Sequence, residues 1–162
     1  RFMGSQSAGL SGAIGLDALA KQVVTLDVAH HQITIEDVAS LAEIRRGGTE
    51  VPIRLGRDAE GVALTVDVGV PTSSGMAWME LDTGNYGPSL VDKSIANLFG
   101  LEPTPAMPQQ WRVPLSGSVI VSGSVIVKKL VLDGNLGRDV LGHWLVTLDL
   151  ASERGWIRIN GP

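Results

Sequence analysis

The sequence has 162 residues, 44% of them hydrophobic, and 13 basic residues against 17 acidic residues give a formal net charge of −4. This composition excludes a mainly disordered chain, and the mild acidity argues against a nucleic-acid partner, which requires clustered Lys and Arg. The absence of cysteine excludes disulfides, thiolate zinc sites and thiol catalysis, and it is compatible with an oxidising or a reducing compartment.

The N-terminal part of the chain predicts a short helix, a hairpin and a second helix. Residues 16–22 favour a helical turn, and two apolar strands follow, one at 23–28 and one that ends at Ile35. Residues 37–46 carry apolar side chains at three-residue spacing, which predicts a helix that stops at Gly47.

The middle of the chain predicts mainly β-structure. Residues 51–55 and 62–68 are expected to pair as strands, 70–75 to form a Pro/Ser/Gly loop, and 76–81 to form a third strand. Residues 94–99 place their apolar side chains on one helical face, which predicts a short helix.

The region that follows is rich in proline and then in valine. Residues 102–114 contain four prolines and predict neither strand nor helix. The segment Gly-Ser-Val-Ile-Val occurs twice, at 117–121 and at 123–127. This repetition predicts a bent strand or a hairpin, which residues 130–132 are expected to extend. No apolar run approaches the roughly 20 residues of a membrane-spanning helix, so we expect no membrane partner.

An internal repeat with a constant offset of 122 residues links the two ends of the chain. Residues 12–29 match residues 134–151, and both copies contain Gly-x-x-Gly followed by Val-Thr-Leu-Asp. We therefore divide the chain into the tail of a first unit at 1–37, a linker at 38–50 and an apparently complete second unit at 51–162.

The candidate chemistry lies in Asp82-Thr83-Gly84, directly after a predicted strand. A strand that enters such a turn presents its Asp to Thr and Gly donors, which can bind the carboxylate. Downstream, Leu136-Gly137-Arg138-Asp139 precedes a predicted short helix.

Together these two motifs resemble those of the retropepsin-like aspartic proteases and their two-lobed pepsin-like relatives. The resemblance covers about residues 51–160, while residues 13–17 match only the second motif. It implies an all-β, closed pepsin/retropepsin-like lobe with short helices, preceded by the last strands of a sister lobe. The catalytic turn would consist of Asp82, Thr83 and Gly84; the supporting and substrate-binding residues would be Asn85, Leu136, Gly137, Arg138 and Asp139.

The mechanism implied by the resemblance requires two carboxylates that share one proton and activate a water. It uses no metal and no cofactor. Asp82 would therefore need a partner carboxylate, supplied by a missing N-terminal lobe or by a second copy of the chain. The expected substrate is an extended polypeptide bound in a cleft.

Three residues depart from the family's pattern and leave a second interpretation open. Asn85 stands where the family usually has Ala or Ser, while Glu80 and Asn135 stand where apolar residues are common. Glu80 is expected to point outward, because neighbouring strand residues alternate faces. The alternative is a non-catalytic protein- or peptide-binding domain with a retropepsin-like fold. A small-ligand-binding barrel has no support beyond the β content.

Other polar residues favour structural roles. Asp17 and Asp139, in the first turns of the predicted helices, are expected to cap or brace them. Arg138 is expected either to brace the lobe through a carboxylate or carbonyl or to lie on the surface. The histidines lack metal-ligand spacing. The segment 102–114, which includes Trp111, lies where the family carries its flap, so it is either a mobile hairpin or a surface loop.

Overall fold

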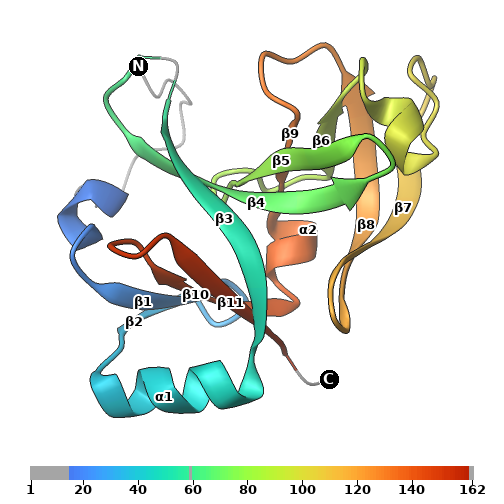
Figure 1. Ribbon diagram of the computed structural model, residues 1–162. Coiled ribbons are helices and arrows are strands. Elements are labelled where there is room, and N and C mark those ends of the chain that lie inside the picture. The colour runs from blue at the N-terminus through green and yellow to red at the C-terminus, as the bar shows by residue number, and fades with distance from the viewer. Residues whose placement is uncertain (1–14, 59, 161–162) are drawn as a thin grey trace.

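Within residues 15–58 and 60–160, which the computed structural model describes, eleven strands form one continuous sheet (Figure 1). The strand order is β2-β1-β10-β11-β3-β4-β5-β9-β6-β8-β7. The elements are η1 (Leu16–Leu19), β1 (Val23–Asp27), β2 (Gln32–Ile35), α1 (Val38–Gly47), β3 (Thr49–Arg57), β4 (Leu64–Thr72), β5 (Gly75–Leu81), β6 (Ser89–Asp92), η2 (Ala96–Phe99), β7 (Gln109–Ser116), β8 (Val119–Lys128), β9 (Gly134–Leu136), α2 (Arg138–Leu141), β10 (Trp144–Asp149) and β11 (Arg154–Ile159).

The two copies of the repeat form equivalent hairpins, β1–β2 and β10–β11, which pair with each other through β1 and β10. Thr25 lies opposite Thr147, its own counterpart in the repeat, so the two hairpins are related by a local two-fold axis between these residues. Their hydroxyl groups form a buried hydrogen bond of 2.8 Å. Residues 12–14, which open the first copy, lie outside the described residues.

The polar turns of the two hairpins are also equivalent. The Asp27 carboxylate accepts a hydrogen bond from the His30 backbone N–H at 3.1 Å, and Asp149 accepts one from the Ser152 N–H at 3.2 Å. Each carboxylate therefore closes the turn that follows its own strand.

The predicted helix after the first hairpin is confirmed as α1. Asp37 is its N-cap, because the Asp37 carboxylate accepts from the Ser40 N–H while the Ser40 hydroxyl accepts from the Asp37 N–H. From its end, β3 crosses the molecule (Figure 1), pairing first with β11 and then, from Ile53 onward, with β4.

Two predicted loops are wrong because prolines lie inside strands. β4 continues through Pro71 to Thr72, so only two residues separate it from β5. β7 includes Pro114, which an edge strand tolerates because the missing N–H need not face a partner. The alternation that buries Trp111 and Leu115 identifies this strand. The valine-rich segment is one strand, β8, and its extension through residues 130–132 is not present.

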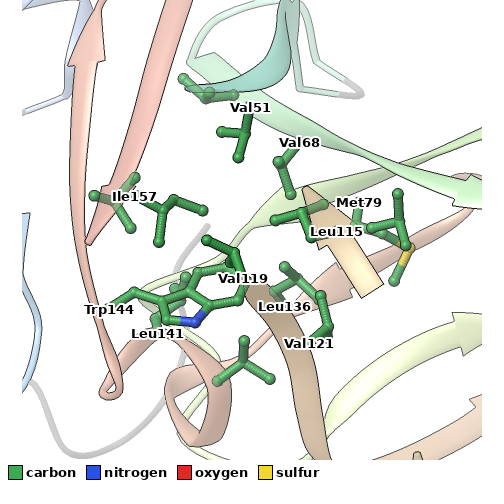
Figure 2. Packing of buried hydrophobic residues seen from close by; sticks show 14 of the residues in the cluster. Val51, Val68, Met79, Leu115, Val119, Val121, Leu136, Leu141, Trp144 and Ile157 are labelled. Carbon is green, nitrogen blue, oxygen red and sulfur yellow. The ribbon is translucent and has the colours of Figure 1, made fainter. Parts of the chain in front are cut away.

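The hydrophobic core fills the space between the two halves of the folded sheet (Figure 2). Trp144 of β10 is 1% exposed and packs beside Val119 and Leu141. Met79 of β5 and Leu136 of β9, both fully buried, continue this core beneath the strand ends that lead to the candidate site. In the described part of the chain, no helix is long and apolar enough to cross a membrane.

Candidate active site

Asp82 follows β5 directly, and its carboxylate is held by the turn that it opens. The Oδ1 atom accepts hydrogen bonds from the Gly84 N–H at 2.9 Å and from the Asn85 N–H at 3.1 Å. The side chain is half-buried, whereas Thr83 and Gly84 are exposed. As expected from the sequence, the turn presents a fixed carboxylate at a strand end.

The second motif lies against this turn. β9 runs parallel to β5, with Leu136 opposite Leu81, and the Leu136 carbonyl accepts from the Asp82 N–H at 3.1 Å. The Arg138 N–H then donates to the Asn85 carbonyl at 2.9 Å. Gly137 permits this approach, because a Cβ at this position would lie 2.7 Å from the Gly87 carbonyl oxygen. The structure thus brings the two sequence motifs together.

Two residues that depart from the family's pattern bind each other and Asp82. The Asn135 side-chain amide donates to Asp82 Oδ2 at 2.8 Å, and Asn85 Nδ2 donates to Asn135 Oδ1 at 3.1 Å. Asn85 also binds the Pro88 carbonyl at 2.9 Å and the Gly87 N–H at 2.9 Å. Both Asp82 oxygens therefore accept hydrogen bonds from the protein, which suits an ionised carboxylate that can only accept.

The Arg138 side chain binds the Asp82 turn at its exposed residue Thr83. Its Nε donates to the Thr83 carbonyl at 2.9 Å, and its guanidinium lies 4.0 Å from the centre of the Tyr86 ring. Of the roles expected for Arg138, the structure shows carbonyl binding. Tyr86 is 78% exposed, so the pair forms part of the surface beside the Asp82 turn.

Asp139 and Asp17 are scaffold residues, and neither caps its helix. The Ser89 hydroxyl donates to Asp139 Oδ1 at 3.1 Å and accepts from the Gly137 N–H at 3.1 Å. Asp17 instead binds Arg57 at 2.5 Å and the backbone of the β3–β4 hairpin. Sequence reasoning missed Ser89, whose only signal is a hydroxyl within an otherwise apolar strand segment.

Carboxylates gather on the outer face of β4 and β5 beside Asp82. Glu80 lies outward as expected, opposite Asp67 of β4, and Asp67 forms an ion pair with Arg54 at 2.8 Å. Burial raises the pKa of Glu80, and the nearby charges of Asp82, Asp67 and Asp58 raise it further.

A cavity of about 350 Å³ opens beside the Asp82 turn. Its mainly apolar wall includes Leu16 of η1 and Leu26 of β1, and Thr83 and Arg138 form part of its rim. The cavity therefore lies between Thr83 of the Asp82 turn and the first copy of the repeat.

Of the two alternatives for the segment 102–114, the structure shows a loop at its start and one arm of the antiparallel β7–β8 hairpin at its end. Residues 109–114 belong to the regular strand β7, and the loop before it is closed by reciprocal bonds between the Gln109 side chain and the Glu102 backbone. In the described ranges, no group of three or more acidic or histidine side chains is placed to hold a metal ion.

Comparison with known proteins gives one structural likeness. No family model matches the sequence, and no curated protein matches it. The solved structure of basic 7S globulin from soybean matches with a TM-score of 0.55 and 13% sequence identity, over 90% of this chain and 53% of that chain. The fold is pepsin-like. The chain spans about half the length of the structure that it matches, so the likeness concerns the fold alone.

The pepsin-like fold agrees with the all-β class expected from the sequence. It also agrees, at this coarse level, with the family resemblance that the two motifs indicated. The activity, the division at residues 37 and 50 and the roles of the site residues remain proposals.

Proposed function

We propose that this chain is the second half of a two-lobed aspartic endopeptidase, in which Asp82 supplies one of two catalytic carboxylates. The observation that carries the proposal is the interlocked turn, in which Gly84 and Asn85 hold Asp82 while Leu136 binds its backbone. A turn that only ends a strand would not need a second segment, 54 residues downstream, to bind its backbone.

In the proposed reaction, Asp82 is the ionised member of the pair. Three N–H donors hold its carboxylate in place, and in the proposed step it accepts a proton from a water held between the two acids. The partner acid would be protonated and would polarise the carbonyl of the peptide bond. The two carboxyl groups need to lie about 3 Å apart to share the proton in this way.

The partner acid is proposed to come from a first lobe or from a second copy of the chain. The cavity beside Thr83 and Arg138 is the opening through which such a partner can reach the turn. The substrate is proposed to be an extended polypeptide that binds in a cleft beside Asp82.

A second candidate function is supported by the bond from Asn135 to Asp82. This amide occupies Oδ2, the carboxylate oxygen that the turn itself leaves free. A chain in which this bond persists in the assembled protein would be a non-catalytic polypeptide-binding domain with the same fold.

The test compares the protein with its Asp82→Asn variant in full-length form. An unfolded polypeptide substrate is incubated with each at about pH 4, with and without pepstatin, and new peptide ends are identified by mass spectrometry. We expect pepstatin-sensitive cleavage that falls by about a thousandfold or more in the variant.

Asp37→Asn is the matched control, because Asn is an equally good N-cap for α1 and the position is remote from the turn in sequence. This variant should cleave like the unmodified protein, and all three proteins should remain folded under the assay conditions. Cleavage unchanged in Asp82→Asn would refute the proposed role of Asp82, whereas substrate binding without cleavage would favour the second candidate.

A further inference from the structure

A second cavity, of about 240 Å³, lies between the β7–β8 hairpin, α2 with the residues that follow it, and the end of β11 (Figure 1). It shares no lining residue with the cavity beside the Asp82 turn. The proposed function therefore gives this second cavity no role.

The exposed part of the cavity lining is mainly polar. Arg112 of β7 lies directly opposite Ser122 of β8, so the two side chains leave the same face of the hairpin. Ser118 in the hairpin turn and His143 after α2 also line the cavity. A guanidinium group, an imidazole ring and two hydroxyl groups are thus brought to one small cavity.

Arg112 differs from most arginines of this chain, because its guanidinium has no hydrogen-bond or ion-pair partner among residues 15–58 and 60–160. Arg138 binds the Thr83 carbonyl, and five others form ion pairs with carboxylates, namely Arg45, Arg46, Arg54, Arg57 and Arg154. No acidic side chain of the described residues lines the cavity, although the chain has 17 acidic residues against 13 basic ones. The cavity is therefore a locally positive site on an acidic protein, which favours an anionic ligand.

The remaining lining of the cavity is apolar. Val140 of α2 and Trp144 of β10 are each 1% exposed and form its buried part. Ile120 of β8 is half-buried, and Ile159 of β11 is 51% exposed. A few polar groups beside an apolar wall are typical of a small-molecule site, in which the polar groups fix the orientation of the ligand.

We propose that this cavity binds an apolar carboxylate. The planar guanidinium of Arg112 can bind both carboxylate oxygens, and the hydroxyl of Ser122 can donate a further hydrogen bond. The apolar body of the ligand would pack against Ile120 and Trp144. Inorganic phosphate would leave this wall without a contact, and a neutral apolar molecule would leave the Arg112 charge without a partner.

The proposed site is separate from the candidate active site but lies on the same short segment. α2 begins at Arg138, which binds the Asp82 turn, and the cavity is lined by Val140 within α2 and by His143 after it. The inference goes beyond the proposed function, because it uses neither Asp82 nor a partner acid. It therefore holds or fails independently of proteolysis.

The test is a titration of the intact chain with benzoate at about pH 6, where this carboxylate is ionised, followed by NMR of the backbone amides. We expect the amides of Ser118, Ser122 and His143 to shift, with a Kd of about a millimolar for so small a probe. Benzamide, which keeps the ring but has no charge, and inorganic phosphate, which has no apolar part, should each bind at least about tenfold more weakly.

Two sources can supply an apolar carboxylate, a free acid and the C-terminus of a polypeptide. The peptide acetyl-Ala-Ala-Phe is therefore titrated beside benzoate, together with its C-terminal amide. Binding of the free-carboxylate peptide that is tighter than that of benzoate would identify a polypeptide terminus as the ligand, and the reverse order would identify a small acid. In either case, the C-terminal amide should bind at least about tenfold more weakly than the free peptide.

Arg112→Gln removes the charge at an exposed position, so the fold should be kept while benzoate binding weakens about tenfold or more. Arg46→Gln is the matched control, because it removes the same charge from an exposed residue of α1 that does not line the cavity. Equal binding of benzamide or phosphate, or an equal loss in both variants, would overturn the proposal. The absence of shifts in the intact chain would also overturn it, including when another part of the chain already fills the cavity.

Discussion

Asn85 and Asn135 are unusual for the resembled family when each is considered alone, but the structure explains them as a pair. Asn135 is 8% exposed, and an apolar residue at position 85 would leave its amide oxygen without the donor it now has. Conversely, Asn135 gives Asp82 Oδ2 a donor that the turn does not supply. Because a buried polar group that loses its partner is costly, the two positions are expected to tolerate change only together.

The first prediction concerns Asn85, whose side chain holds the loop that follows Asp82. Asn85→Ala removes bonds to Pro88, Gly87 and Asn135, so we expect the free energy of unfolding to fall by about 2 kcal/mol. Asn97→Ala, at an exposed position of η2, is the matched control and should change it by less than about 0.5 kcal/mol. Urea unfolding measures both. Equal effects would show that the network does not stabilise the loop.

The second prediction concerns acid stability and Asp92. Hydrogen bonds from the Ser94 hydroxyl, the Leu130 N–H and the Ser94 N–H lower the pKa of Asp92 from 3.8 to about 2. The folded state thus favours the ionised form, and this stabilisation is complete above about pH 4 and is lost as the pH falls toward 2.

Asp92→Asn should therefore lower the urea midpoint at pH 6 and flatten its dependence on pH between 4 and 2. The measurement is a series of urea unfolding curves across this range for both proteins. A variant that keeps the slope of the unmodified protein would show that another carboxylate causes the acid transition. The bond from the Leu130 N–H to Asp92 joins β6 to the segment before β9.

At the scale of elements, the site depends on a three-residue strand inserted between two others. β9 pairs in parallel with β5 and antiparallel with β6, and so joins the strand that ends at Asp82 to the strand that carries Ser89. The insertion requires close backbone approach. At Gly134, a Cβ would lie 2.2 Å from the Leu90 carbonyl oxygen and 2.5 Å from Met79 Cε.

The third prediction follows from this contact. Gly134→Ala should lower the free energy of unfolding by about 3 kcal/mol or more, since a backbone oxygen cannot move aside easily. Gly47→Ala, whose new Cβ would meet nothing within 4 Å, should be neutral or stabilise α1 by about 0.5 kcal/mol. Thermal and urea unfolding distinguish the two. A mild effect of Gly134→Ala would mean that β9 can shift without loss of the sheet.

Local sequence patterns predicted the elements whose signals are local. Helix α1 follows from its spacing and the Asp37 cap, and the strands before Asp82 follow from alternation. The strand β9 was missed, because Gly134-Asn135-Leu136 is short and becomes a strand only by pairing with residues more than 50 positions away. The position of β7 was not predicted, because the prolines of this segment indicate a loop. The alternation that buries Trp111 and Leu115 indicates a strand, and the structure has a strand.

For the site, the sequence predicted Asp82, its turn and the motif at Leu136 and Gly137, which the structure places together. The cooperation of Asn85 with Asn135 was not predicted, because their 50-residue separation gives no periodic signal. Capping by Asp17 was wrong for a similar reason, since Arg57 of the next hairpin offers a stronger partner than the helix terminus.

At the scale of the molecule, the duplicated ends of the chain meet at a local two-fold axis. Thr25 and Thr147 are 6% and 1% exposed, and their hydroxyl groups form a hydrogen bond of 2.8 Å with each other. The pairing of β1 with β10 thus joins the two copies of the repeat across a buried polar contact.

The fourth prediction tests this axis with a double-mutant cycle. Thr25→Val or Thr147→Val alone leaves the remaining hydroxyl buried without its partner, so each should lower the free energy of unfolding by about 1–3 kcal/mol. The double variant replaces both hydroxyls by methyl groups of similar size, and it should be more stable than the sum of the single effects predicts by at least about 1 kcal/mol. Urea unfolding of the four proteins gives the coupling directly. Additive effects would show that the two threonines do not depend on each other, and that the two copies of the repeat meet only through backbone pairing.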